Sequence, residues 1–153
     1  MTIRKGNKND LAEMKQLFAG TITAVCKRDY SCEQIEAWKS GADNEERWLK
    51  VIQDQKVLIA LSENKIIGFC TLHKNYIDLL FVHQDYQHQG VAFTLYTQTE
   101  KEAIKQKEQQ LTADVSTTAK PFFEKMGFQV ISQQTVKVKG VDLINYKMEK
   151  NLV

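Results

Sequence analysis

The sequence contains one proline, three cysteines and a formal net charge of only +2. The single proline, with no low-complexity linker and no internal repeat, gives no sign of a domain boundary. We therefore expect one domain over residues 1–153. The nearly balanced charge gives no reason to expect nucleic acid or an anionic membrane as a partner.

The cysteines and histidines also exclude several classes of protein. Cys26, Cys32 and Cys70 lack metal-ligand spacing, and their odd number argues against a disulfide framework. No histidine has a neighbouring cysteine or aspartate at ligand spacing, so we expect no metal site. No apolar stretch approaches the roughly 18 residues needed to span a bilayer, and the first residues lack the apolar region of a signal peptide. A cytoplasmic protein is the expectation.

The hydrophobic pattern changes its period along the chain, which indicates an α+β fold with a mixed central sheet. Helical spacing fills residues 9–53, where Asn9 or Asp10, Ser31 with Gln34, and Asp43 or Asn44 are candidate helix starts. We expect a short edge strand over 2–5. Downstream we expect strands over 57–61, 66–72, 76–82, 111–115, 128–138 and 141–148, with helices over 90–107 and 118–126.

A short glycine-containing segment between a strand and a helix is the most informative feature. The apolar run from Tyr76 to Val82 is followed by Gln87-His-Gln-Gly-Val-Ala92, which opens a long helical pattern. Backbone N–H groups at a helix start suit a phosphate or pyrophosphate, and Gly90 has no Cβ to keep an anion away. The spacing fits neither the ATP-type P-loop nor the Rossmann fingerprint.

Two segments carry a resemblance to a known family. Gln87 to Ala92 resembles the Q/R-x-x-G-x-G/A acyl-CoA signature of the GCN5-related N-acetyltransferase (GNAT) superfamily. Ser116 to Phe128 resembles its N-x-x-A-x-x-F-Y-x-K-x-G-F segment, and the chain is most similar to a bacterial subgroup of small acetyltransferases. The resemblance implies a GNAT fold, with a mixed, mostly antiparallel sheet of about seven strands that is splayed at the acyl-CoA site and flanked by helices.

The resemblance further implies acetyl-CoA as the acyl donor. Its pyrophosphate would rest on the N–H groups of His88 to Phe93, and its pantetheine arm would pair with the strand end as an added strand does. The implied contact residues are Leu80, Phe81, Val82, Gln87, His88, Gln89, Gly90, Val91, Ala92, Phe93, Ser116, Phe122 and Phe123.

The implied activity is an N-acetyltransferase. It would move an acetyl group to a primary amine of a small molecule or peptide by direct attack in a ternary complex, and the protein is a possible homodimer. The alternative is a non-catalytic acyl-CoA-binding sensor or partner-binding module, supported only by Phe123. Another acyl donor, such as succinyl-CoA, also remains open.

Two departures from the family pattern concern mechanism. Ser116 replaces a common asparagine, and Phe123 stands where many members carry a tyrosine thought to protonate the departing thiolate. Releasing a free thiolate at neutral pH costs only about 2 kcal/mol, whereas deprotonating a lysine-like amine costs about 4.6 kcal/mol. A group that accepts the amine proton is therefore the larger requirement.

Five further residues are candidates for chemistry or substrate contact. Asp78, a carboxylate inside an apolar strand, and Tyr76 are the predicted catalytic groups; the alternatives are a hydrogen-bonded structural carboxylate and a core tyrosine. Tyr30, Trp38 and His73 are the predicted substrate contacts; core packing is the alternative for Trp38 and simple solvation for His73.

Overall fold

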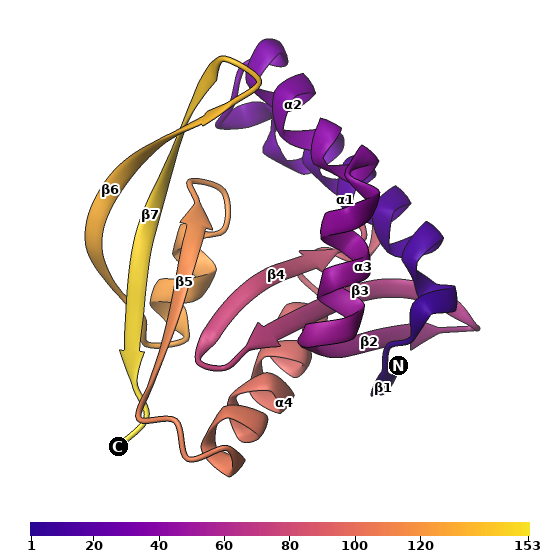
Figure 1. Cartoon of the computed structure of the whole chain (residues 1–153), viewed down its shortest axis with the longest axis vertical. Helices are drawn as coiled ribbons and strands as arrows, with labels where there is room; N and C mark the ends of the chain where they lie inside the picture. The colour runs from indigo at the N-terminus through magenta and orange to yellow at the C-terminus, as the bar shows by residue number, and fades with distance from the viewer.

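The computed structural model describes residues 1–153 and contains one mixed sheet with helices on both faces (Figure 1). The strands are β1 (Thr2–Lys5), β2 (Lys56–Ser62), β3 (Lys65–His73), β4 (Tyr76–Val82), β5 (Gln110–Ser116), β6 (Gln129–Val138) and β7 (Val141–Asn151). The α-helices are α1 (Leu11–Val25), α2 (Cys32–Lys39), α3 (Glu45–Asp54), α4 (Val91–Lys105) and α5 (Lys120–Lys125). The seven strands lie in the order β1-β2-β3-β4-β5-β7-β6, and only β4 and β5 are parallel neighbours. The predicted α+β fold with a mixed sheet is confirmed.

Local sequence explains where two of the five helices begin. Ser31 and Gln34 form the predicted capping box at the start of α2, and the Asn44 side chain accepts the Arg47 N–H at the start of α3. The first helix differs from the prediction. Asn7 caps a short 3₁₀ turn before it, because the Asp10 carboxylate accepts bonds from Arg4 and from the Asn7 backbone instead of capping α1.

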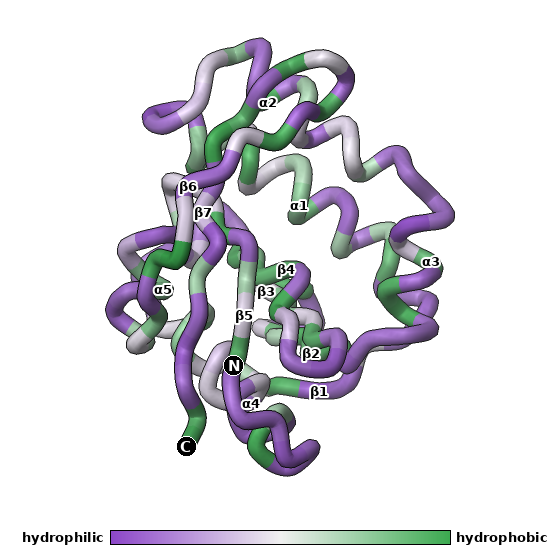
Figure 2. Tube along the Cα trace, turned by 60° about the vertical axis from the view of Figure 1, so that its left-hand side comes forward, coloured by the Kyte–Doolittle hydropathy of each residue, from purple (hydrophilic) through white to green (hydrophobic).

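Two hydrophobic cores occupy opposite faces of the sheet. Helices α1, α2 and α3 cover one core, which includes Phe18, Trp48 and Phe69, whereas α4 and α5 cover the other, which includes Leu95 and Phe123. In Figure 2 hydrophobic stretches follow β3 and β4 in the interior. The sheet therefore separates two sides of the molecule, called here the α1–α3 side and the α4–α5 side.

The sheet is divided at its only parallel pair. β4 and β5 are in register only at Tyr76 with Thr112 and at Ile77 with Ala113, and then the strands diverge. We call the open wedge between residues 78–82 of β4 and 114–116 of β5 the fork; it is visible in Figure 1 where the two arrows part. The register of β3 with β4 also shifts at this point, so Asp78 is the extra residue of a β-bulge.

One tyrosine ties the two halves of the divided sheet together. Tyr30 lies between α1 and α2, and its hydroxyl donates to the Ile144 carbonyl of β7 at 2.6 Å. The same oxygen accepts the Thr117 N–H at 2.9 Å, just after β5. The ring is buried and packs against Trp38, and the hydroxyl also lies 3.4 Å from the Thr117 hydroxyl. It joins the helices of the α1–α3 side to the β5–β7 half.

We predict that Tyr30→Phe destabilises the fold by about 1–3 kcal/mol, since the partly buried Ile144 carbonyl and Thr117 N–H lose their partner. For a chain of this size that loss lowers Tm by roughly 2–4 °C per kcal/mol, measurable by calorimetry. Tyr86→Phe is the matched control, because the Tyr86 hydroxyl makes no hydrogen bond. Equal Tm values for Tyr30→Phe and wild type would show that the hydrogen bonds of the Tyr30 hydroxyl do not stabilise the fold.

Candidate active site

The end of β4 forms one wall of the fork. Leu80 and Val82 face the α4–α5 side, whereas Phe81 packs on the α1–α3 side against Phe18 and Phe69 at ring-centroid distances of 4.9 and 5.8 Å. Beyond the last paired residues, the edge of β4 that faces β5 has no strand partner. The predicted residues Leu80, Phe81 and Val82 therefore lie along an open strand edge, which an extended ligand can pair with.

The glycine segment forms a loop whose N–H groups lack partners. His88 and Gly90 both have positive φ, at 59° and 84°, and α4 begins at Val91 without a side-chain cap. The first backbone bond of the helix is donated by Thr94, so the N–H groups from His88 to Phe93 are unpaired. A Cβ at Gly90 would meet nothing within 4 Å. This arrangement suits an anion, because alternating backbone conformations and a helix start turn several N–H groups outward together.

Side chains around this loop mainly hold it in place. Gln87 donates its amide to the Val82 carbonyl at 2.7 Å, and Thr21 of α1 donates its hydroxyl to the same oxygen at 2.9 Å. Gln89 bonds the Asp85 carbonyl, and the Phe93 side chain is 56% exposed. In this structure, then, Gln87 and Gln89 order the loop, and its exposed donors are backbone groups.

The second predicted motif lies on the opposite wall of the fork. The Ser116 hydroxyl accepts the Ala119 N–H at 3.1 Å, so it closes the turn before α5. Phe122 is half-buried and packs edge-on against Tyr96 at 6.4 Å. Phe123 is only 4% exposed and lies against Phe128 at 5.0 Å, so its ring offers little surface to a ligand.

Asp78, the predicted base, accepts three hydrogen bonds on its own side of the fork. Arg47 of α3 holds both carboxylate oxygens, at 3.1 and 3.2 Å, and Gln55 donates to one of them at 2.8 Å. These contacts are the ones that the structural alternative for Asp78, a hydrogen-bonded carboxylate, predicts. The Gln55 Oε1 atom is buried beside it and makes no hydrogen bond.

Tyr76 contacts a residue that the sequence did not single out. Its hydroxyl donates to Asp114 of β5 at 2.9 Å across the closed end of the fork. Burial, and then the adjacent Asp114 carboxylate, raise the pKa of Tyr76 above its usual value, so the hydroxyl stays a neutral donor. Asp114 also accepts from Gln134 of β6 at 2.9 Å. The alternating pattern of residues 111–115 could have indicated that Asp114 faces away from the core.

The predicted substrate contacts do not form one group. Tyr30 is buried, with its hydroxyl engaged as described above. Trp38 is partly exposed and packs between Tyr30 and Phe81, at ring-centroid distances of 5.3 and 6.5 Å. His73 is exposed at the end of β3, where it pairs with Tyr76. Of the three, Trp38 and His73 retain accessible side-chain surface.

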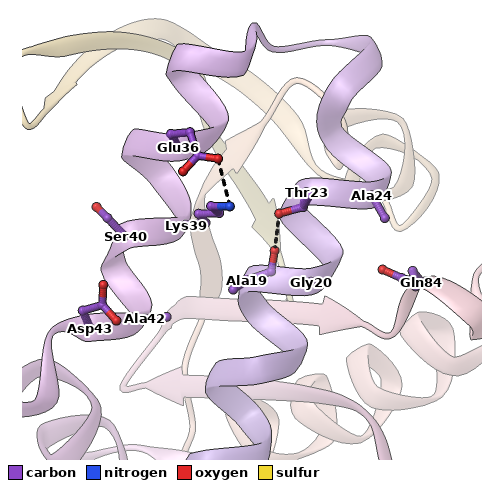
Figure 3. A pocket seen from close by; sticks show the side chains of 10 residues that line it. All are labelled: Ala19, Gly20, Thr23, Ala24, Glu36, Lys39, Ser40, Ala42, Asp43 and Gln84. Atoms are coloured by element: carbon purple, nitrogen blue, oxygen red, sulfur yellow. Dashed lines mark hydrogen bonds and ion pairs between the residues drawn. The ribbon is translucent and has the colours of Figure 1, made fainter.

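Two surface grooves lie on the α1–α3 side. One of about 590 Å³ runs between α1 and α2, where the Glu36–Lys39 ion pair stands over small side chains (Figure 3). It contains no residue predicted from the sequence to contact a ligand. The other, of about 400 Å³, lies between α3 and β4 and is lined by Arg47, Gln55 and Asp78. No group of three or more histidine, cysteine or acidic side chains is arranged to hold a metal.

Comparisons with known proteins agree with this geometry. A family model described as an acetyltransferase (GNAT) domain matches residues 26–150. An uncharacterized N-acetyltransferase of Escherichia coli K12, YafP, is 36% identical over 146 residues, which cover 95% of this chain and 93% of that protein.

Solved structures give the same architecture. The crystal structure of a GCN5-related N-acetyltransferase from Rhodopseudomonas palustris superposes with a TM-score of 0.95 at 36% identity, over 99% of this chain and 95% of that one. The PaiA N-acetyltransferase of Thermoplasma acidophilum, solved with coenzyme A, has a TM-score of 0.78 at 24% identity, over 98% of each chain. No helix in the structure is long and apolar enough to cross a membrane.

We predict that Asp78→Asn lowers Tm, because Arg47 loses its ion-pair partner and the amide offers one acceptor oxygen where the carboxylate offers two, at a cost of about 1–3 kcal/mol. Asp142→Asn, which removes a solvent-exposed ion pair with Lys137, is the control and should change Tm by much less. Thermal unfolding of the three proteins measures the difference. An unchanged Tm together with a large fall in turnover would instead favour Asp78 as the predicted base.

Proposed function

The chain belongs to the GNAT acetyltransferase family, and on that premise we propose that it is an acetyl-CoA-dependent N-acetyltransferase. It moves an acetyl group to a primary amine of a small molecule or peptide by direct attack in a ternary complex. The observation that carries this proposal is the fork, which opens directly beside a loop of unpaired N–H groups.

The donor site fits the parts of acetyl-CoA. The loop from His88 to Phe93 supplies N–H donors for a pyrophosphate, and the open space at Gly90 lets the anion reach them. The free edge of β4 supplies backbone groups for the amide units of the pantetheine arm. A slender chain laid along this edge brings its thioester toward the closed end of the fork.

The two substrates approach from different sides of the sheet. The loop continues into α4, which lies on the α4–α5 side, whereas the partly exposed Trp38 and Phe81 lie on the α1–α3 side. An amine that enters from the α1–α3 side meets the thioester at the fork. Holding both reactants there makes the attack effectively unimolecular, which is the main advantage of a ternary complex.

The cysteines support direct attack by the amine rather than a covalent acyl-enzyme. Burial raises the pKa of the Cys70 thiol to about 12, so it stays protonated and unreactive at neutral pH. Cys26 is also buried, and burial raises its pKa. Cys32 is exposed at the start of α2, away from the strands that form the fork.

The first test is binding of the donor. We predict that coenzyme A raises Tm of the wild-type protein, because a ligand that binds only the folded state stabilises it. Gly90→Glu should abolish this shift, since a carboxylate is placed at the anion site. Gly140→Glu is the matched control: Gly140 also has positive φ and open surroundings but lies in the β6–β7 turn. No shift in the wild type at millimolar coenzyme A would refute the donor assignment.

A second prediction concerns the general acid, the group that would protonate the departing thiolate. We expect Phe123→Tyr to change kcat by less than about tenfold, because unassisted thiolate release costs only about 2 kcal/mol, which limits any gain to roughly thirtyfold. Tm should fall, since a hydroxyl at a site that is 4% exposed costs roughly 1–3 kcal/mol without a partner. A hundredfold gain in steady-state kcat would favour the alternative, a binding module that has lost proton transfer.

A further inference from the structure

The strand β6 forms one edge of the sheet and has no partner along its outer side. The strand order ends β5-β7-β6, so β7 bonds one side of β6, and Figure 1 shows the other side facing outward. Every residue of the strand except Gln134 and Val138 is exposed. Residues of an antiparallel strand bond alternately to its two sides, so about half of the backbone N–H and C=O groups of β6 lack a strand partner. These groups can bond an added strand.

The outer side of β6 carries few of the features that keep edge strands apart, which are short length, charge, proline and bulges. The opposite edge strand, β1, is only four residues long and includes Arg4 and Lys5. In contrast, β6 has ten residues, no proline and one charged side chain, Lys137. Its register with β7 shifts once, at Ile131. Beyond this bulge, residues 132–138 form a regular run that is open to pairing.

Exposed apolar side chains lie on both faces of β6. Val136 pairs with Leu143 and so faces the α1–α3 side, whereas Val130 pairs with Met148 and faces the α4–α5 side. Both valines are exposed, as is Ile131 at the bulge. A helix laid on one face of the sheet would cover only one of these rows, whereas a strand added at the edge lies beside both. The exposed side chains therefore fit a strand as the partner.

The charge of the edge fits a second copy of β6 better than a charged strand of another protein. Lys137 already forms an ion pair with Asp142 of its own chain, at 3.7 Å, so the edge offers no unpaired charge to attract an acidic or basic partner. A twofold axis at Thr135, the midpoint of the regular run, pairs the run with itself in antiparallel direction. This axis keeps the two copies of Lys137 roughly 13 Å apart along the strands, which exceeds the Debye length at physiological salt.

We propose that β6 pairs with β6 of a second copy of this chain, antiparallel over residues 132–138 and around a twofold axis at Thr135. Each contact then occurs twice: Gln134 lies opposite the partner's Val136, and Val136 lies opposite the partner's Gln134. The two sheets become one continuous sheet, and the free edge is used up. The inference rests on this edge alone and is independent of the proposed acetyltransferase function.

The first test is the oligomeric state in solution. A strand pair of this length is smaller than a standard protein interface, so we expect a Kd in the micromolar range. Sedimentation equilibrium of the wild type at about 0.1 mM should then give close to twice the 17.6 kDa mass of one chain. A monomeric wild type at this concentration would overturn the proposal, and so would open-ended assembly, because a twofold interface closes on itself.

A charge on the axis should separate the two copies. Thr135→Lys places two ammonium groups opposite each other and should raise the dimer Kd by about tenfold or more. Thr2→Lys is the matched control: it makes the same change at an exposed threonine of the other edge strand, β1, and should leave Kd within about twofold. Tm and far-UV circular dichroism check that each variant is folded. An unchanged Kd in folded Thr135→Lys, or an equal loss in Thr2→Lys, would contradict the assignment of β6.

Cross-linking tests the register and does not require Thr135→Lys to fold. Cys32→Ser removes the exposed thiol and serves as the background. In it, Thr135→Cys should give a covalent dimer with a short bismaleimide, because directly opposed Cβ atoms lie about 5 Å apart, and Thr2→Cys should not. No cross-linked dimer with Thr135→Cys, or as much with Thr2→Cys, would show that the copies do not meet at β6.

Discussion

The parting of β4 and β5 after two paired positions is the constraint on which the rest of the site depends. A parallel pair needs a long crossover, and here α4 supplies it, so the start of α4 necessarily lies at the end of β4. The free edge of β4 follows from this break in pairing, and the loop of unpaired N–H groups from His88 to Phe93 lies beyond its end. A sheet with full register between β4 and β5 would have no open strand edge at this point.

Several contacts keep the divided sheet in a defined shape. The Tyr30 hydroxyl connects the α1–α2 connection to β7 and to the residue after β5. On the other side, Lys150 of β7 donates hydrogen bonds to Glu100 and Tyr96 of α4. Burial raises the pKa of Glu100, but the bonds that it accepts from Lys150 and from Tyr96 lower it by more. The β5–β7 half of the sheet is thus attached to the segment between α1 and α2 on one face and to α4 on the other. These ties hold the two halves of the sheet in a fixed relation on either side of the fork.

The sequence predicted the elements that depend on local pattern. The strand from Tyr76 to Val82 and the helix after Gly90 follow from hydrophobic period and a glycine at positive φ, and both are present. The roles of Asp78 and Asp114 depend on partners far away in the chain. Arg47 lies 31 residues from Asp78, and Tyr76 lies 38 residues from Asp114. Periodicity carries no information on such contacts, so the sequence singled out Asp78 but could not indicate its bonds to Arg47 and Gln55, or the bond between Tyr76 and Asp114. Family membership supplied the cofactor class, which no local pattern could have identified alone.

The fork also gives the protein two strand edges in its interior. Unpaired edges usually recruit other chains and lead to aggregation, and proteins protect them with charges, bulges or short strands. Here the β4 edge begins with a bulge at Asp78, and the fork carries a carboxylate on each wall. A polypeptide strand that paired with the β4 edge would bring its side chains into a wedge that is closed at one end. A thin ligand arm carries no side chains and therefore fits more easily. The same backbone groups thus remain available to a small molecule and resist pairing with another protein chain.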